Sequence, residues 1–411
     1  MKKQQLSVRL YGKEIGILEQ NSSGKLNFIY KEDNNISISN SLPLTKKEFN
    51  DKECRPYFNG LLPESDIVRK YLGKIFGINA NNDFSLLQAI GHDCAGALSL
   101  HSLEEPVNVK EYIKLEYEPL TDKQLKKHIE ELPYKPFFAQ SDNDVRLSLA
   151  GTQDKGAITL INNRVCLPKN STPTTHILKP LITNLSNTII NEYVCMKTAK
   201  KLSINVSEVK ICEVENLKYL LIERYDRQIK NDMVKRIHQE DFCQALGILS
   251  INKYQADGGP NIKACFDLLD ITKVPAISRN MLMKIFIFNF LIGNNDAHAK
   301  NFSLLYVEDK PVLAPAYDIV CTQMYPELTK KMAMKIGSIY DKKFVTKVDF
   351  EKMCNEINYS YKSFSKEFIN MATVLPNMIK EESSNFNKKE KKFINKIIDV
   401  VETNSKIAQY L

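Results

Sequence analysis

The sequence predicts an α+β fold with a small β-rich part at the N-terminus and a mostly helical C-terminal lobe. Residues Leu6–Ile38 alternate strand-like runs with turns, as in a small antiparallel sheet. Residues 281–293 (MLMKIFIFNFLIG) are apolar almost throughout, as in a buried helix ending at Gly293, and Glu367–Leu411 has a helical composition. The length of 411 residues suits two or three structural units. A composition shift at Glu104–Val107 and the motifs below predict units at residues 1–105, 106–225 and 226–411.

Asp296 and Asn301 lie in the polar run after the apolar helix, and Asp318 follows two short strand-like runs. Phosphotransferases place a proton acceptor and metal-binding oxygens in this order. Asp296 suits the acceptor, while Asn301 and Asp318 offer the hard oxygen ligands that Mg²⁺ prefers. The spacing alone is a weak signal, because a polar turn and a strand end give the same pattern. The two strands are expected at residues 302–307 and 312–313, joined at residues 308–310.

Upstream, residues 146–160 (RLSLAGTQDKGAITL) place Ala150, Gly151 and Gly156 in a loop between strand-like runs. Such a loop can bring backbone N–H groups close to phosphate oxygens, and Lys155 adds a positive charge. Neither the Walker A spacing nor the glycine pattern of protein kinases is present. The loop therefore permits phosphate binding without identifying it.

An extended run, Thr175–Lys179, ends in a lysine, which is costly in a buried strand unless it meets an anion. The helix expected at residues 191–202 carries Glu192 near its start, where a glutamate can pair with that lysine. Equally, Glu192 suits the dipole of a first helical turn, and Lys179 can be a surface residue. The strand expected at residues 218–223 leads into a connection, Glu223–Tyr225, that could present backbone groups to adenine.

Loop, lysine, helix glutamate, hinge and catalytic residues follow one another in the order of a bilobal protein kinase. The runs AGTQDKGA, THILK, LIERYDR, YQADGGPNI, FLIGNNDAHAKNFSLL and LAPAYDI, with YFNGLLPES and GHDCAGAL nearer the N-terminus, resemble the HipA family of bacterial toxin serine/threonine kinases. The resemblance covers most of the chain. It implies a protein-kinase-like fold and Mg²⁺-ATP as the phosphoryl donor.

Residue by residue, the resemblance makes Asp296 the catalytic acceptor and Asn301 and Asp318 the metal ligands. Ser148 matches a serine that family members autophosphorylate, and a phosphate there would compete with the nucleotide for the same donors. Departures from ordinary protein kinases include His298 in place of a lysine. The implied ATP-binding residues are Ala150, Gly151, Thr152, Gln153, Asp154, Lys155, Lys179, Glu223, Arg224, Tyr225, His298, Lys300, Asn301 and Tyr317.

The resemblance also implies a small helix-turn-helix antitoxin of the HipB type as partner, with operator DNA contacted mainly through it. The expected protein substrate is an aminoacyl-tRNA synthetase, whose phosphorylation halts translation. The net charge of +8 favours acidic partners without requiring one. A small-molecule kinase of the aminoglycoside-phosphotransferase type and a catalytically dead co-repressor scaffold are the alternatives.

Nine cysteines without a Cys-x-x-Cys pair indicate neither a disulfide framework nor a zinc site. The first residues are polar, with no signal peptide, and the apolar run at residues 281–293 is too short to cross a bilayer. We therefore expect a cytoplasmic protein without a membrane segment.

Overall fold

The computed structural model describes residues 4–114, 116–133, 154–169, 172–182, 184–231, 233–308 and 310–411. The chain divides into two compact units. Unit 1 contains residues 1–180, 212–251 and 305–307, and unit 2 contains residues 181–211, 252–304 and 308–411. The three-part division expected from the sequence stays a prediction.

Unit 1 begins with a five-stranded antiparallel sheet in the order β4-β3-β2-β1-β5. Its strands are β1 (Gln4–Leu10), β2 (Lys13–Gln20), β3 (Leu26–Tyr30), β4 (Glu48–Phe49) and β5 (Leu98–His101). Helices α1 (Asp51–Gly60), α2 (Asp66–Phe76) and α3 (Asp83–Ile90) follow, and α1 packs against β3. Phe28, Tyr57 and Phe58 are fully or almost fully buried between them. The small antiparallel sheet predicted near the N-terminus is confirmed.

A second sheet of unit 1 has six strands in the order β11-β12-β10-β8-β9-β7. They are β7 (Tyr117–Pro119), β8 (Gly156–Ile161), β9 (Arg164–Pro168), β10 (His176–Lys179), β11 (Val209–Val214) and β12 (Leu217–Glu223). Helix α4 (Asp122–Glu131) packs its buried Leu125 and Ile129 on Ile158, Leu178 and Leu221 of this sheet. The strands predicted to end at Lys179 and Glu223 are confirmed, and β10 lies between β8 and β12.

Unit 1 also contains four further strands and a short helix in the described part of the chain. Strands β13 (Arg227–Lys230), β14 (Met233–Arg236) and β6 (Ile113–Lys114) form a small sheet. Strand β15 (His238–Asp241) leads into the single-turn helix α6 (Phe242–Ala245). Gly156, expected in a loop, is instead the first residue of β8, because its backbone pairs with Leu178 in the sheet.

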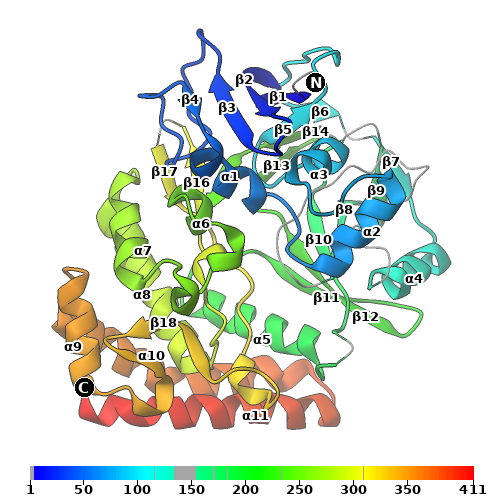
Figure 1. The fold of residues 1–411 in the computed structure, drawn as a ribbon. Helices are drawn as coiled ribbons and strands as arrows, with labels where there is room; N and C mark the ends of the chain where they lie inside the picture. The colour runs from blue at the N-terminus through cyan, green and yellow to red at the C-terminus, as the bar shows by residue number, and fades with distance from the viewer. Residues whose placement is uncertain are drawn as a thin grey trace. The chain divides into compact units, whose positions relative to one another are not determined.

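Unit 2 is mostly helical, as predicted. It contains α5 (Thr188–Lys201), α7 (Ile262–Leu268), α8 (Pro275–Ile292), α9 (Lys347–Glu356), α10 (Tyr361–Glu382) and α11 (Lys388–Ser405). Figure 1 shows the long helices α10 and α11 side by side, and both pack on α8 and α5. The rings of Phe290, Phe350, Phe364 and Phe368 pack against one another in tilted or edge-on pairs with centroids 4.9–5.7 Å apart, so aromatic packing joins α8, α9 and α10.

Short strands connect the helices of unit 2. They are β17 (Lys310–Leu313), β18 (Lys331–Ile336) and β19 (Ile339–Asp341), and β16 (Ser303–Val307) precedes β17. Lys310, expected in the turn between β16 and β17, is instead the first residue of β17. Glu308, directly after β16, adopts a left-handed conformation, with φ of 62°.

Helix α8 is longer than the apolar run that predicted it, since it begins at Pro275, a residue suited to a first helical position. Among the described residues it is the one helix whose length and composition would allow it to cross a membrane. The expectation that this segment is too short for that purpose was based on residues 281–293 alone. Of its 18 residues, 56% are buried, and the helix packs on α10 and α11.

Candidate active site

The candidate site begins where α8 ends. Gly293 caps the helix with φ of 80°, a left-handed conformation that favours glycine. A Cβ atom there would lie 2.6 Å from Cγ1 of Val400, so the position also lacks space for a side chain. The chain can therefore leave the helix sharply, and the polar run beginning at Asn294 follows at once, as predicted.

Asp296 is held from three directions. The phenol of Tyr254 donates a hydrogen bond to Oδ1 of Asp296 at 2.6 Å. The backbone N–H of Asp296 donates to Oδ1 of Asn294 at 3.0 Å, and Asn294 is itself anchored to Asn289 of α8. Nδ2 of Asn301 donates to the backbone carbonyl of Asp296 at 2.9 Å. These bonds fix the carboxylate in one orientation, with one oxygen engaged by Tyr254.

Asn301 lies at the end of a 3₁₀ turn (Ala299–Asn301), and its N–H donates to the carbonyl of His298 at 2.9 Å. Since its Nδ2 bonds Asp296, the orientation of the amide is set. Oδ1 is therefore the atom that Asn301 offers to a cation. The structure thus brings two of the predicted site residues, Asp296 and Asn301, into direct contact.

Asp318 is tied to the same loop through its neighbour. The phenol of Tyr317 donates to the carbonyl of Lys300 at 2.7 Å and lies 2.7 Å from Oγ of Ser303. Asp318 itself has φ of 57°, a left-handed conformation that is uncommon outside glycine and concentrates at functional sites. Tyr317 therefore holds the segment carrying Asp318 beside Lys300 and Asn301.

The donor set fits Mg²⁺. An amide oxygen from Asn301 and a carboxylate from Asp318 are the hard oxygen ligands that this cation takes. The orientation of the Asn301 amide, set by its bond to Asp296, presents the oxygen and not the nitrogen. These two residues are thus suited to hold the metal expected from the sequence.

Lys179 and the predicted hinge belong to unit 1. Lys179 ends β10, is 7% exposed and pairs in register with Leu220 of β12. His176 at the other end of β10 pairs with Glu223, and the N–H of Arg224 donates to the carbonyl of Thr175 at 3.0 Å. The lysine thus ends one strand of the sheet, and the hinge follows the neighbouring strand. Glu192 lies in α5 of unit 2 and is 3% exposed, and its pairing with Lys179 stays a prediction.

The side chain of Arg224 is not aimed at a ligand, because it is locked in a buried ionic network. It bonds both carboxylate oxygens of Asp226, at 3.0 and 2.9 Å, and the carbonyl of Cys94 at 3.1 Å. Asp93 accepts from Arg227 at 2.8 Å and lies 3.2 Å from Arg236. Arg224 could therefore serve a nucleotide only through its backbone.

The pKa of Asp93 shows how strong this network is. Burial would raise that pKa, but the guanidinium groups of Arg227, Arg236 and Arg224 lower it below its ordinary value. Asp93 thus stays ionised, and the network joins the segment after α3 to the hinge within unit 1.

Part of the predicted phosphate loop lies outside the described residues. This holds for Ala150, Gly151, Thr152 and Gln153, and for the predicted phosphosite Ser148. Asp154 and Lys155 are described and directly precede β8. Burial raises the pKa of Asp154, and nearby Lys155 lowers it to a smaller extent. His298 and Lys300, also predicted as nucleotide contacts, are buried in the polar run that follows α8.

Tyr254 is the site residue that sequence reasoning missed. It precedes Asp296 by 42 positions, in the run YQADGGPN, which carries no spacing signal for catalysis. Its ring also meets the ring of His298 edge-on, with centroids 5.1 Å apart. A single phenol thus contacts both the predicted acceptor and a predicted nucleotide contact.

A second group of possible metal ligands lies in unit 1, where the ligand atoms of His92, His101 and Glu105 are within 4.8 Å of one another. Nδ1 of His101 is 2.8 Å from Glu105, and the two imidazoles stack. Burial and the positive charges of Arg9 and Arg236 lower the pKa of His101 despite Glu105. Two nearby guanidinium groups disfavour a cation, so we interpret the group as a hydrogen-bonded cluster.

The α+β fold and the order of Asp296, Asn301 and Asp318 along the chain are typical of kinases. Residues 147–383 match the HipA-like C-terminal domain, and residues 6–101 match the HipA N-terminal domain. The chain belongs to the HipA family.

Individual relatives agree with this assignment. The chain is 40% identical over 340 residues to Y4mE of Sinorhizobium fredii, a protein named as a kinase, with 81% of this chain and 80% of the relative covered. It is 30% identical over 294 residues to the serine/threonine-protein kinase toxin HipA of Shewanella oneidensis, with 68% and 66% covered. The solved complex of Shewanella oneidensis HipA with HipB and operator DNA matches with a TM-score of 0.85 at 24% identity, covering 97% of this chain and 96% of that one.

Proposed function

We propose that this protein is an ATP- and Mg²⁺-dependent kinase that phosphorylates serine or threonine in a protein substrate. The observation that carries the proposal is the orientation of Asp296, held by Tyr254 on one oxygen and by Asn301 through the backbone carbonyl. Phosphoryl transfer requires positioning and charge stabilisation more than covalent chemistry. A fixed carboxylate beside two hard oxygen ligands supplies the positioning.

In the proposed mechanism, Asp296 accepts the proton of the attacking hydroxyl on the carboxylate oxygen not bonded by Tyr254. Asn301 and Asp318 would hold Mg²⁺, which when bound neutralises charge on the phosphates. Lys179 contacts phosphate oxygens as a point charge. The backbone of Glu223–Tyr225 binds adenine. Asp154, Lys155, His298, Lys300 and Tyr317, with residues 150–153, complete the proposed ATP site.

The biological role we propose is that of the toxin in a toxin–antitoxin pair. The relative from Shewanella oneidensis is named as a kinase toxin, and its structure was solved with HipB and operator DNA. By analogy, a HipB-type antitoxin would neutralise the kinase activity of this chain. The antitoxin would also make most of the contacts to operator DNA. The proposed substrate is an aminoacyl-tRNA synthetase, with growth arrest as the outcome.

Ser148 is the proposed regulatory phosphosite. A phosphoserine carries about −1.5 to −2 charges at neutral pH and would compete with the nucleotide for phosphate-binding donors. Incubation with ATP followed by mass spectrometry should find phosphate on this serine. A serine that stays unmodified in the active enzyme would refute self-regulation at this position.

The decisive experiment for the kinase proposal is incubation with labelled ATP and candidate proteins, followed by separation of proteins from small molecules. Asp296→Asn should reduce protein labelling by about 10²- to 10⁴-fold, since this is the contribution of a positioned general base. Asp257→Asn, an exposed aspartate of unit 2, is the matched control. Label in a small molecule would favour the aminoglycoside-kinase alternative. No label with either protein would favour a co-repressor scaffold.

A further inference from the structure

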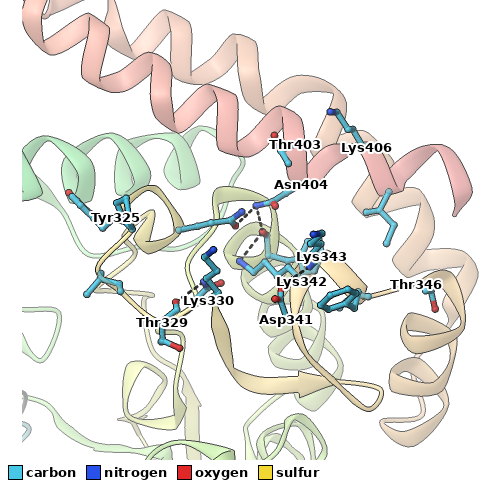
Figure 2. Close-up of a pocket in the computed structure, with 18 of the residues that line it drawn as sticks. Tyr325, Thr329, Lys330, Asp341, Lys342, Lys343, Thr346, Thr403, Asn404 and Lys406 are labelled. Atoms are coloured by element: carbon cyan, nitrogen blue, oxygen red, sulfur yellow. Dashed lines mark hydrogen bonds between the residues drawn. The ribbon is translucent and has the colours of Figure 1, made fainter.

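A pocket in unit 2 is lined by residues other than those of the proposed ATP site. Its volume is about 980 Å³, near the upper end of the range for ligand pockets. The walls come from the end of α8, the segment around residues 323–330, the segment after β19, and the C-terminal part of α11 with the turn that follows (Figure 2). All of these segments belong to one compact unit, so the pocket is formed within it.

The lining is strongly basic. One acidic side chain, Asp341, lines the pocket together with five lysines: Lys330, Lys342, Lys343, Lys347 and Lys406. Clustered ammonium groups in a concave site raise the local concentration of anions. The charge of the walls therefore favours an anionic ligand.

Lys342 is the deepest of these lysines and is 8% exposed. Its Nζ donates to the carbonyls of Asn289 and Phe290 at 3.2 and 3.1 Å, at the C-terminal end of α8. An ammonium group has three N–H donors, so these two bonds do not exhaust it. Within the described ranges, no carboxylate forms an ion pair with Lys342. A buried cation without a counter-ion is costly, and burial lowers the pKa of Lys342 to about 7.

Asn295, which also lines the pocket, carries a hydrogen-bond acceptor that a ligand could satisfy. It is 3% exposed, and its Oδ1 is buried without a hydrogen-bond partner in the described part of the chain. Its Nδ2 donates to the carbonyl of Thr329, and its N–H donates to Oγ1 of Thr322, so the side chain is held in place. Leaving such an acceptor unpaired costs about 1–3 kcal/mol. A ligand with an N–H or O–H group would satisfy it.

Aromatic rings complete the lining. Phe344 and Tyr410 line the pocket and remain 61% and 68% exposed, which is high for such large side chains. Phe290 and Tyr325 contribute buried rings. Exposed aromatic rings beside lysines suit a ligand with a planar ring and a phosphate group.

We propose that this pocket binds a small phosphorylated ligand with a planar, hydrogen-bonding ring, of the nucleoside monophosphate class. The phosphate would lie among the lysines as the counter-ion of Lys342. The ring would meet the aromatic side chains, and one of its N–H groups would bond Oδ1 of Asn295. This site is distinct from the proposed ATP site, which uses other residues.

Calorimetric titration with uridine 5′-monophosphate tests the proposal, because uridine avoids the adenine preference of a kinase hinge. Uridine and inorganic phosphate are titrated separately. We expect the monophosphate to bind, phosphate to bind at least about tenfold more weakly and uridine not to bind, because affinity needs both charge and ring. The proposal would be overturned if the monophosphate did not bind, or if uridine bound equally well. It would also be overturned if inorganic phosphate bound as well as the monophosphate, because the pocket would then hold an adventitious ion only.

Variants locate the binding. The double variant Lys330→Gln/Lys343→Gln should weaken monophosphate binding by about tenfold or more, since both lysines line the pocket and are exposed. Lys388→Gln/Lys389→Gln, on the exposed start of α11, makes the same charge change elsewhere in unit 2 and should have no effect. Lys342→Met should weaken binding further.

Lys179→Met separates this pocket from the proposed ATP site. The monophosphate should bind this variant as it binds the unaltered protein. If Lys179→Met abolishes binding and the Lys330/Lys343 variant does not, the ligand occupies the ATP site and the pocket proposal is wrong. Kinase activity is measured separately, so a failure of the proposed function leaves this result interpretable.

Discussion

The phenol oxygen of Tyr254 lies 2.6 Å from Oδ1 of Asp296 and donates a hydrogen bond to it. We propose that the other oxygen of this carboxylate accepts the proton of the substrate hydroxyl. Tyr254→Phe removes the bond and keeps the ring against His298. We expect kcat to fall about tenfold with little change in the KM for ATP, because the substitution disturbs the orientation of Asp296 and not the binding of ATP.

Steady-state kinetics on a purified protein substrate would measure this split. Tyr359→Phe is a suitable control, because Tyr359 lies in the turn between α9 and α10, outside the candidate site. A rise in KM with unchanged kcat would mean that Tyr254 acts in binding and not in positioning Asp296.

Asp318 combines a left-handed backbone with a proposed metal-binding carboxylate. Asparagine tolerates this conformation better than most residues, so Asp318→Asn should keep the backbone while removing the charge. We expect the affinity for a non-hydrolysable ATP analogue to fall at least about tenfold when Mg²⁺ is present. Without Mg²⁺ the affinity should stay nearly the same.

Calorimetry with and without Mg²⁺ separates the two contributions. The free energy of unfolding serves as the control and should change little in Asp318→Asn. Equal affinities of the variant and the unaltered protein in Mg²⁺ would remove Asp318 from the proposed metal site.

The sequence was sufficient for those parts of the site that depend on local chain geometry. The apolar run ending at Gly293 predicted both the helix and the place where the polar loop begins. Asp296 and Asn301 lie five positions apart on that loop, so their contact follows from one tight turn. The strand ending at Lys179 was also predicted, from the extended run Thr175–Lys179.

Features that depend on distant contacts were not predictable. Tyr254 contacts Asp296 only because the fold of unit 2 brings together two segments that are distant in the sequence. The sequence did not show where the side chain of Arg224 lies, and Asp226 and the carbonyl of Cys94 hold it in a buried network. Gly156 was expected in a loop because glycine suggests flexibility, but pairing with Leu178 placed it in a strand. In each case tertiary contacts outweighed the local signal.

The network around Asp93 predicts a large stability effect. Oδ2 of Asp93 accepts from the N–H and hydroxyl of Thr174 at 3.1 and 3.0 Å, and Oδ1 accepts from Arg227 at 2.8 Å. Asp93→Asn would leave buried guanidinium groups without their counter-charge. We expect the free energy of unfolding to fall by about 3–5 kcal/mol.

Urea denaturation would measure this loss, and Asp33→Asn, which changes an exposed aspartate of unit 1, provides the control. The control should stay within about 0.5 kcal/mol of the unaltered protein. If the free energy of unfolding of Asp93→Asn equalled that of the control, the network would contribute little to stability. Other contacts would then have to hold the hinge in place.

His238 predicts how stability depends on pH. Burial lowers its pKa to about 4, although its bond to the carbonyl of Ile38 opposes the shift. Nδ1 is buried without a partner among the described residues, so a second proton there would find no acceptor. In the unfolded chain the pKa is about 6.5. Between these values the unfolded state binds the extra proton, so stability falls as pH decreases from about 6.5 towards 4.

Between pH 7.5 and pH 5, this histidine should therefore cost about 2 kcal/mol of unfolding free energy. His238→Gln carries no proton that titrates in this range, so its stability should fall less over the same interval. His128→Gln, on the partly exposed side of α4, should follow the unaltered protein. Urea denaturation at both pH values measures the difference. Parallel losses in the unaltered protein and His238→Gln would show that other groups dominate acid destabilisation.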